Sequence, residues 1–311
     1  AKMQILDQEG KVVEEWVSKK EAHVVYALAP GEYILHEEQA PTEQGYVRAE
    51  DVKFVVEETG DVQKVKMEDD HTKVSISKTD ITDGKEIEGA KLQILDQDGE
   101  VVESWTTGEE HLIEYLPVGT YTLHEEAAVD GYIVANDVEF TVEETGEIQK
   151  VKMEDERAMG QLVIVKTDTD SKAALEGVEF VLLEKETGKE VGRLKTGKDG
   201  KAVSELLPIG TYENGVFKEP ITYVLKETAT LKGYEKTEEE WEIVFTYQND
   251  KTPVIEVVKE IQNKKIPETP GTVKPGPKTG DDTNWFLPLL ALGVSAGMVA
   301  GLLYYRKRHR K

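Results

Sequence analysis

The chain carries the same sequence more than once, and this internal repeat limits it to an array of similar domains. AKMQILDQEGKVVEEW (residues 1–16) recurs as AKLQILDQDGEVVESW (90–105). DVKFVVEETGDVQKVKMEDD (51–70) recurs as DVEFTVEETGEIQKVKMEDE (137–156). A weaker third copy runs from about residue 160 to residue 263. The chain therefore predicts tandem domains rather than one large core.

Each copy reads as short strands of alternating apolar and polar residues, separated by turn signals such as DQDG, EETG and KDGK. No long helical period precedes residue 284. Regularly spaced short strands indicate an all-β fold of tandem β-sandwich domains, prealbumin-like or immunoglobulin-like. The Asp-x-Asp-Gly turns lack the further ligands of a calcium loop, so we interpret them as hairpin turns.

The repeats and the composition of the C-terminal end predict six segments. Three are β-sandwich repeats, at residues 1–70, 71–157 and 158–265, followed by a Pro-rich linker (266–283), a transmembrane segment (284–305) and a basic cytoplasmic tail (306–311). The first repeat has no counterpart of HTKVSISKTDITDGKEIEG (71–89). We therefore expect the sequence to begin inside its first domain, which then lacks its first strand unless upstream residues supply it.

Charge and composition exclude several classes of function. The 311 residues carry a formal net charge of −24 and contain no cysteine. Nucleic-acid binding needs a basic footprint, so that class is excluded. An acidic, charge-rich surface is typical of a soluble, extracellular-type protein. Because no disulfide is available, something else must hold such domains together outside the cell.

A His-Glu pair occurs in both YILHEE (33–38) and YTLHEE (121–126) and resembles the start of a zinc-protease motif. That motif needs a second histidine four residues later on a helix, where this chain has Ala40 and Ala128. Both tracts also alternate with the period of a strand, which places His124 on the polar face. We predict no metal site and no cofactor. Glu125, by contrast, falls on the apolar face.

Three strands of the second repeat end an apolar stripe with an ionisable group. Lys78, Glu125 and Asp155 each share a strand face with the apolar residues two and four positions before them. Burial of one charge alone is costly, so the pattern makes sense if the three side chains meet in the core. The alternatives are a buried ion-paired triad without further chemistry, or strand ends that are simply exposed.

If they meet, the three groups can react. Burial disfavours the charged forms, which makes Lys78 a neutral nucleophile and a protonated Asp155 an electrophile, while Glu125 transfers the proton. Contact in a dry core gives a high effective concentration. The product is an isopeptide bond between Lys78 Nζ and Asp155 Cγ, with loss of water. By analogy with disulfide loop closure, such a bond contributes roughly 4–5 kcal/mol.

The second repeat resembles a collagen-adhesin B-type domain, a prealbumin-like β-sandwich of Gram-positive surface proteins. The resemblance rests on five motifs in order, SKTD (77–80), EGAKLQILD (88–96), GTYTLHEE (119–126), DGY (130–132) and KMED (152–155). It is closest to the type that forms a Lys–Asp isopeptide bond, which implies that Lys78 and Asp155 are joined with Glu125 as the promoting residue.

The resemblance extends to the other two repeats. In the third repeat it implies a Lys–Asn bond that releases ammonia, with Lys166 and Asn263 joined and Glu227 promoting. The strand that ends at Asn263 is less regular, because Lys259 shares the parity of its apolar residues. In the first repeat, Glu37 and Asp69 match the promoting and acceptor residues, and the lysine is missing from the sequence.

The C-terminal residues resemble a sortase sorting signal. PKTG (Pro277, Lys278, Thr279 and Gly280) precedes the uncharged WFLPLLALGVSAGMVAGLLYY (285–305) and the tail RKRHRK (306–311). The apolar stretch is long enough to span a bilayer, and the basic tail favours a cytoplasmic C-terminus. The resemblance implies that a sortase joins Thr279 to a cell-wall or pilin amine. Gly276 stands where leucine is usual, which leaves the class of sortase open.

These features together predict the stalk of a cell-wall-anchored, extracellular surface protein of a Gram-positive bacterium. Its repeats would be locked by isopeptide bonds that form without an enzyme, and they would project an N-terminal functional region. We expect no catalysis beyond this self-modification. A minor or basal pilin and an adhesin that binds host matrix or another cell-surface ligand remain alternatives. A shaft pilin would need an acceptor lysine in a motif such as Tyr-Pro-Lys, and none occurs.

Overall fold

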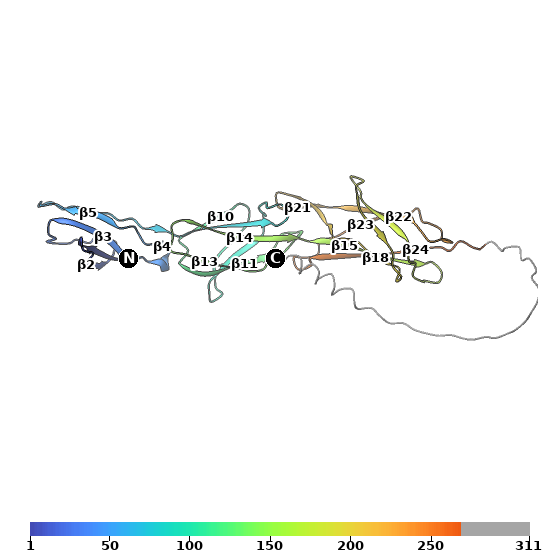
Figure 1. Cartoon of the computed structure of the whole chain (residues 1–311), viewed down its shortest axis with the longest axis horizontal. Coiled ribbons are helices and arrows are strands. Elements are labelled where there is room, and N and C mark those ends of the chain that lie inside the picture. The colour runs from blue at the N-terminus through green and yellow to red at the C-terminus, as the bar shows by residue number, and fades with distance from the viewer. Residues whose placement is uncertain (269–311) are drawn as a thin grey trace, which may run out of the picture. The chain divides into compact units, whose positions relative to one another are not determined.

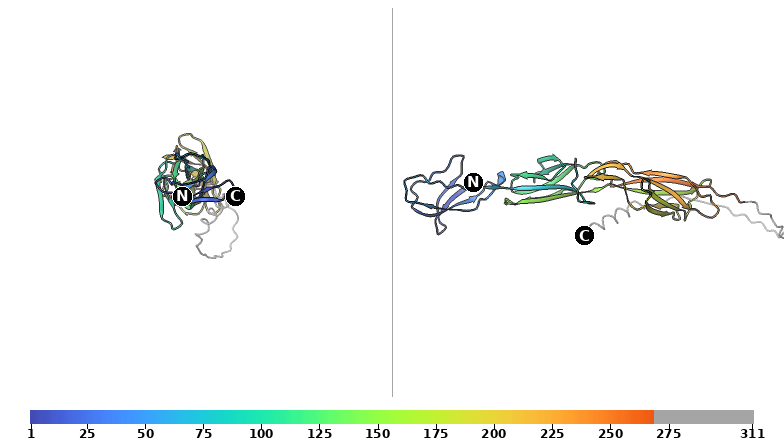
Figure 2. Two further views of the ribbon diagram at one scale, coloured as in Figure 1. Left: turned by 90° about the vertical axis from the view of Figure 1, so that its left-hand side faces the viewer. Right: turned by 90° about the horizontal axis from the view of Figure 1, so that it is seen from above.

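The computed structural model describes residues 1–268, and its ordered elements are almost entirely β-strands (Figure 1). The exception is a single turn of 3-10 helix, η1 (Thr42–Gln44), and the two further views in Figure 2 show the same strands and coils. Residues 1–266 form one compact unit. The prediction of an all-β fold is therefore confirmed for the part of the chain that is described. No helix in that part has the length and apolar character to cross a membrane; the predicted segment 284–305 lies outside it.

The second repeat is a sandwich of two four-stranded sheets. One sheet has the order β10-β7-β14-β12, formed by β10 (His111–Glu114), β7 (Lys73–Asp80), β14 (Ile148–Arg157) and β12 (Tyr132–Ile133). The other has the order β13-β11-β8-β9, formed by β13 (Val138–Val142), β11 (Gly119–Ala127), β8 (Lys91–Leu95) and β9 (Val101–Thr106). Because strand side chains alternate between faces, each sheet contributes one apolar face to the shared core.

The first and last strands of the second repeat lie side by side. β7 and β14 pair in parallel from Lys73↔Ile148 to Asp80↔Asp155. A parallel pair needs a long crossover, and here almost the whole repeat forms it. The pairing brings the two ends of the domain's sequence together at one place.

The third repeat has the same plan. β15 (Met159–Asp168) pairs in parallel with β24 (Val254–Asn263) and antiparallel with β18 (Lys201–Val203) and β19 (Leu207–Pro208). The second sheet has the order β17-β16-β22-β23, formed by β17 (Glu190–Lys195), β16 (Glu179–Glu184), β22 (Thr222–Ala229) and β23 (Glu240–Val244). A separate hairpin joins β20 (Gly210–Glu213) to β21 (Val216–Pro220) through Asn214 and Gly215, both with positive φ, as a tight hairpin requires.

The first repeat forms only one of the two sheets, so the expected sandwich is incomplete. Its sheet has the order β2-β1-β3-β5, formed by β2 (Val12–Val17), β1 (Lys2–Leu6), β3 (Gly31–Gln39) and β5 (Val52–Val56). A short pair, β4 (Tyr46–Val47) with β6 (Asp70–His71), corresponds to β12 with β14. No strand of this repeat corresponds to β7 or β10.

The predicted hairpin turns are confirmed. Between β8 and β9, the Asp96 carboxylate accepts hydrogen bonds from the backbone N–H groups of Asp98 and Glu100, each at 2.9 Å. Asp7 does the same for Glu9 and Lys11 in the first repeat. The aspartates that suggested calcium therefore hold their own turns. Within the described residues, no group of three or more acidic or histidine side chains could hold a metal ion.

Candidate isopeptide sites

The second repeat brings Lys78, Glu125 and Asp155 together inside its core. Lys78 lies on β7, Asp155 on the adjacent β14, and Glu125 on β11 of the facing sheet. All three are buried, with Lys78 and Glu125 2% exposed and Asp155 fully covered. Lys78 pairs with Met153 of β14. Asp155 lies two residues after Met153 on β14, so its side chain is on the same face of the sheet as those of Met153 and Lys78.

The contacts of the three side chains suit a reaction between lysine and aspartate. Lys78 Nζ contacts Asp155 Oδ1 and lies 2.9 Å from Glu125 Oε2. The same oxygen, Glu125 Oε2, also accepts a hydrogen bond from the backbone, since Ala135 N–H donates to it at 2.6 Å. Oε1 of Glu125 and Oδ2 of Asp155 have no hydrogen-bond partner in the described structure. Buried polar oxygens without partners are rare, and here they belong to the two carboxyl groups that contact Lys78 Nζ.

The electrostatics of the site favour a protonated Asp155. Burial raises the pKa of Asp155 to about 7; the positive charge of Lys78 opposes this rise and the carboxylate of Glu125 adds to it. A neutral carboxyl is the form that a nucleophile can attack, because a carboxylate repels it. The burial of Asp155 therefore favours the form of the carboxyl that a nucleophile can attack.

The third repeat places Lys166, Glu227 and Asn263 in the same arrangement. Lys166 is on β15, Asn263 on the adjacent β24, and Glu227 on β22 of the facing sheet. Asn263 Nδ2 donates to Glu227 Oε1 at 2.7 Å, and Lys166 Nζ lies 4.0 Å from Glu227 Oε2. Lys166 Nζ has no hydrogen-bond partner in the described structure and is fully buried. Burial lowers the pKa of Lys166 to about 8, against the attraction of Glu227.

The irregular strand of the third repeat has a simple explanation. Lys259 shares the parity of Asn263, and it is half-buried rather than buried. Its Nζ lies 5.9 Å from the centroid of the Trp241 ring, so the side chain runs across an aromatic face toward solvent. Asn263, further along β24, is 2% exposed.

The first repeat holds only part of such a site. Glu37, on β3, is fully buried, and its Oε2 accepts a hydrogen bond from Ala49 N–H at 2.7 Å. Burial raises the pKa of Glu37, the backbone hydrogen bond opposes this rise, and the charge of Asp69 adds to it. Asp69 itself is exposed and lies outside any strand. The structure therefore places Glu37, the predicted promoting residue, in the core and leaves Asp69, the predicted acceptor, in solvent.

Two groups near the sites were not identified from the sequence. Thr230 Oγ1 is a second acceptor, at 2.7 Å, for the Asn263 Nδ2 that would leave as ammonia. Glu86 accepts a hydrogen bond from Lys78 N–H at 3.1 Å and also contacts the Ser77 hydroxyl, and so it holds the end of β7. Glu86 lies in the loop that follows β7, and Thr230 directly follows β22, 33 positions from Asn263. No local sequence pattern marks such contacts.

A further buried carboxylate, that of Asp80, ends β7 and was not identified from the sequence. It accepts hydrogen bonds from Tyr132 Oη at 2.7 Å and from Arg157 Nε at 2.6 Å. These contacts lower the pKa of Asp80, although burial alone would raise it. Arg157 in turn lies 4.1 Å above the ring of Tyr212 in the third repeat. Asp80 therefore has a structural role where the second repeat meets the third.

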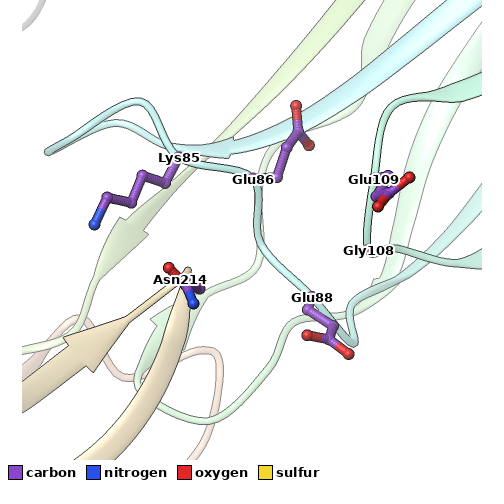
Figure 3. Close-up of a pocket in the computed structure, with 6 residues that line it drawn as sticks. All are labelled: Lys85, Glu86, Glu88, Gly108, Glu109 and Asn214. Carbon is purple, nitrogen blue, oxygen red and sulfur yellow. The ribbon is translucent and has the colours of Figure 1, made fainter.

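The pocket shown in Figure 3 contains none of the predicted bonding residues, although Glu86, which accepts a hydrogen bond from Lys78 N–H, lines it. It has a volume of about 470 Å³ and is lined by Lys85, Glu86, Glu88, Gly108, Glu109 and Asn214. The two histidines of the His-Glu pairs are also elsewhere. His124 Nδ1 lies 2.7 Å from Asp137, and His36 Nδ1 lies 2.6 Å from Asp51, both at the surface side of their strands. The sorting motif lies beyond residue 268, outside the described residues.

The SpaA family of prealbumin-like fold domains matches residues 1–71, 72–157 and 160–220. No curated protein matched the chain. Among solved structures, the Bacillus anthracis TIE protein is 28% identical with a TM-score of 0.54, over 85% of this chain and 48% of that protein. The chain thus spans about half the length of that protein.

Two solved pilin structures have lower similarity. A streptococcal ancillary pilin is 19% identical with a TM-score of 0.30, over 78% of this chain and 77% of that one. The minor pilin GBS52 of Streptococcus agalactiae is 20% identical with a TM-score of 0.28, over 66% of this chain and all of that one. The three family matches cover most of the chain; two coincide with the first and second repeats and the other covers the first part of the third repeat, and so the chain belongs to the SpaA family of prealbumin-like fold domains.

Proposed function

We propose that this chain is a cell-wall-anchored surface stalk whose second and third repeats are locked by isopeptide bonds that they form themselves. The observation that carries the proposal is the buried contact of Lys78 with both Asp155 and Glu125. In each complete repeat the lysine is on the first strand and its acceptor is on the last, and the two strands are adjacent.

The reaction in the second repeat needs no outside reagent. Lys78 Nζ attacks Cγ of protonated Asp155 and forms a tetrahedral centre. Glu125 accepts a proton from Nζ and gives it to the departing hydroxyl, so that one C–N bond forms, one C–O bond breaks and one water leaves. In the third repeat Lys166 attacks Asn263 Cγ. Glu227, which already contacts Nδ2 at 2.7 Å, transfers the proton that converts the leaving group to ammonia.

The position of the bond gives it a mechanical role. Because β7 and β14 are parallel, force that pulls the start of β7 against the end of β14 shears their hydrogen bonds. An amide between Lys78 and Asp155 transmits that force directly. The 77 positions that separate the two residues then lie outside the loaded path. The isopeptide bond would thus give this cysteine-free protein the covalent cross-link that a disulfide provides in other extracellular proteins.

The C-terminal signal supplies the attachment. Pro277-Lys278-Thr279-Gly280, the apolar stretch and the basic tail have the order of a sorting signal. In this proposal the precursor spans the membrane with its C-terminus in the cytoplasm. A sortase then cleaves after Thr279 and transfers the threonine carboxyl to an amine of peptidoglycan or of a pilin. The repeats are thereby extracellular, and the chain has no catalytic activity apart from its self-modification.

The intact mass of the recombinant chain tests the bonds. We expect it to be below the sequence mass by one water and one ammonia. Glu125→Ala should restore the water alone, while Glu126→Ala, at the exposed neighbouring position, should change nothing except the mass of the side chain. A chain with the full sequence mass would overturn the proposal.

Attachment is tested in a sortase-bearing Gram-positive host. The wall-released protein should end at Thr279, linked to a peptidoglycan amine, and Thr279→Ala should remain in the membrane fraction. Linkage to a lysine of another protein would instead identify a pilin subunit. If the Thr279→Ala variant were linked to the wall as the unaltered chain is, this attachment site would be wrong.

A further inference from the structure

The third repeat contains a β-hairpin that has no counterpart in the second repeat. LPIGTY (207–212) matches LPVGTY (116–121). The second repeat then continues directly along β11, whereas the third turns back through Asn214 and Gly215 and begins β22 only at Thr222. The hairpin of β20 and β21 is a two-stranded sheet of its own, outside both sheets of the sandwich. It is therefore an insertion whose contacts must be sought on another surface.

The middle of the hairpin lies on the second repeat. Tyr212 Oη donates a hydrogen bond to Gly131 O at 2.8 Å, and its ring meets that of Tyr132 edge to face, with centroids 5.2 Å apart. The guanidinium of Arg157 lies 4.1 Å from the centroid of the same Tyr212 ring. Asp80 accepts hydrogen bonds from both Tyr132 and Arg157. One side chain of the third repeat thus has aromatic, cation–π and hydrogen-bond contacts with groups that Asp80 holds in place.

The tip of the hairpin lies against the loop between β7 and β8. A Cβ added at Gly215 would lie 2.2 Å from Glu86 O and 2.8 Å from Ile87 Cα. Because both are backbone atoms, a side chain at this position would force the two repeats apart. Asn214, beside Gly215, faces Lys85 and Glu86 across the pocket shown in Figure 3. The hairpin therefore contacts the second repeat at two separate places.

Two further segments of the third repeat reach the same end of the second. Tyr247 Oη donates to Tyr132 O at 2.9 Å, and Val134 N–H donates to Asp250 O at 2.9 Å. Ile133, on β12 of the second repeat, packs against the core of the third. Neighbouring domains of one chain usually move relative to each other unless a substantial interface joins them. Contacts from several segments of both repeats oppose such movement here.

The third repeat has the same glycine-tyrosine turn without a hairpin upon it. Gly131 and Gly233 both have φ of +88°, and each precedes a tyrosine. A Cβ added at Gly131 would lie 2.7 Å from the Phe217 ring and 2.8 Å from Tyr212 Oη. At Gly233 no atom of the described residues lies within 4 Å of such a Cβ. Gly131 is buried and Gly233 is exposed, so the hairpin accounts for the difference between two otherwise similar turns.

We propose that the end of the second repeat is an interaction surface for an aromatic β-hairpin with glycine at its tip, and that the hairpin of the third repeat occupies it. The surface consists of Gly131, Tyr132, Arg157 and the backbone of Glu86 and Ile87. Occupation of this surface holds the second and third repeats as one rigid body. None of the predicted bonding residues belongs to the surface, so the contact does not depend on the isopeptide bonds.

The distance between two spin labels tests the proposal in the whole chain, which has no cysteine of its own. Ser104→Cys on β9 and Val203→Cys on β18, both exposed, place one label in each repeat. Pulsed electron resonance should give one narrow distance distribution. Gly131→Ala should broaden it at least about twofold, because the added methyl group displaces the hairpin and frees the repeats to move. Gly233→Ala introduces the same backbone strain without the contact and should leave the distribution narrow.

Tyr212→Ala provides a second variant that leaves the glycine turn intact, and it should broaden the distribution as Gly131→Ala does. A broad distribution in the chain that carries only the two labels would overturn the rigid contact. A narrow one in Tyr212→Ala would overturn the role of the hairpin. Equal broadening by Gly131→Ala and Gly233→Ala would show that strain in the turn, rather than the contact, is responsible.

The intact mass of the labelled chain keeps this inference separate from the proposed function. A narrow distribution in a chain that has lost neither water nor ammonia would overturn the proposed bonds and support the contact between the repeats. A broad distribution in a chain with both losses would overturn the contact and leave the bonds in place.

Discussion

Lys78 Nζ lies 2.9 Å from Glu125 Oε2, and neither side chain is more than 2% exposed. The pair comes from facing sheets, so it exists only when the sandwich has closed. Amide formation needs an amine nucleophile and a group that accepts its proton, in addition to the carbonyl carbon that is attacked. Here Lys78 and Glu125 can fill these two roles, and they are held in contact in the core. The bond in each repeat should therefore depend on the glutamate of that repeat alone.

Independence of the two bonds is the first prediction. Glu125→Ala should prevent the bond of the second repeat only, and Glu227→Ala should prevent that of the third only. Each loss should destabilise its own repeat by roughly 4–5 kcal/mol, the loop-closure contribution, when urea unfolding is followed by exchange in that repeat. A single substitution that removed both mass losses would show that the repeats are not separate sites.

Exchange of the leaving group is the second prediction. Asp155→Asn should change the group lost from the second repeat from water to ammonia, because the atom that leaves is the one attached to Cγ. Asn263→Asp should make the opposite change in the third repeat. The chain that carries both substitutions should then have an intact mass below its sequence mass by one water and one ammonia. If neither single variant formed its bond although its repeats were folded, the two repeats would not share this mechanism.

The pH dependence of an unbonded third repeat is the third prediction. Burial lowers the pKa of Lys166 to about 8 from 10.5. Between these values the unfolded state binds more protons than the folded state, so stability rises with pH across this range. In Asn263→Ala, which cannot form the bond, the free energy of unfolding should increase by about 3 kcal/mol from pH 8 to pH 10.5.

A matched variant isolates this effect from other groups that titrate in the same range. Asn263→Ala combined with Lys166→Met removes the amine and keeps a side chain of similar length. Chemical unfolding at a series of pH values should show the rise in the single variant and not in the double variant. Equal slopes in both would mean that Lys166 is not the group responsible.

Protection of the two copies of QKVKMED is the fourth prediction. Amides of residues 149–155 are paired in the sheet, and those of residues 63–69 are not. Hydrogen exchange of the first copy should be at least about a hundredfold faster. The flanking residues Val62 and Ile148 give the two peptides different masses, so mass spectrometry distinguishes them. Equal protection would show that the first repeat completes its second sheet by another route, and size-exclusion chromatography would then reveal whether a second copy supplies it.

Some features of this protein follow from its sequence alone. Alternation along a strand is a local property, so the sequence was enough to place Lys78, Glu125 and Asp155 on apolar faces, and the structure buries all three. Repetition of the motifs was enough to predict tandem all-β domains. The turn aspartates Asp7 and Asp96 were also readable, since each bonds only to residues within four positions of itself.

Other features were decided only by the tertiary structure. Thr230 reaches Asn263, and Arg157 reaches Asp80, across loops whose paths no local pattern shows. The clearest case is QKVKMED, which is a strand at residues 149–155 and not at residues 63–69. A strand satisfies its backbone hydrogen bonds only through a neighbour, so its formation depends on a partner elsewhere in the chain. The sequence by itself determined which face of each strand would be apolar, and the presence of that partner decided whether the strand formed.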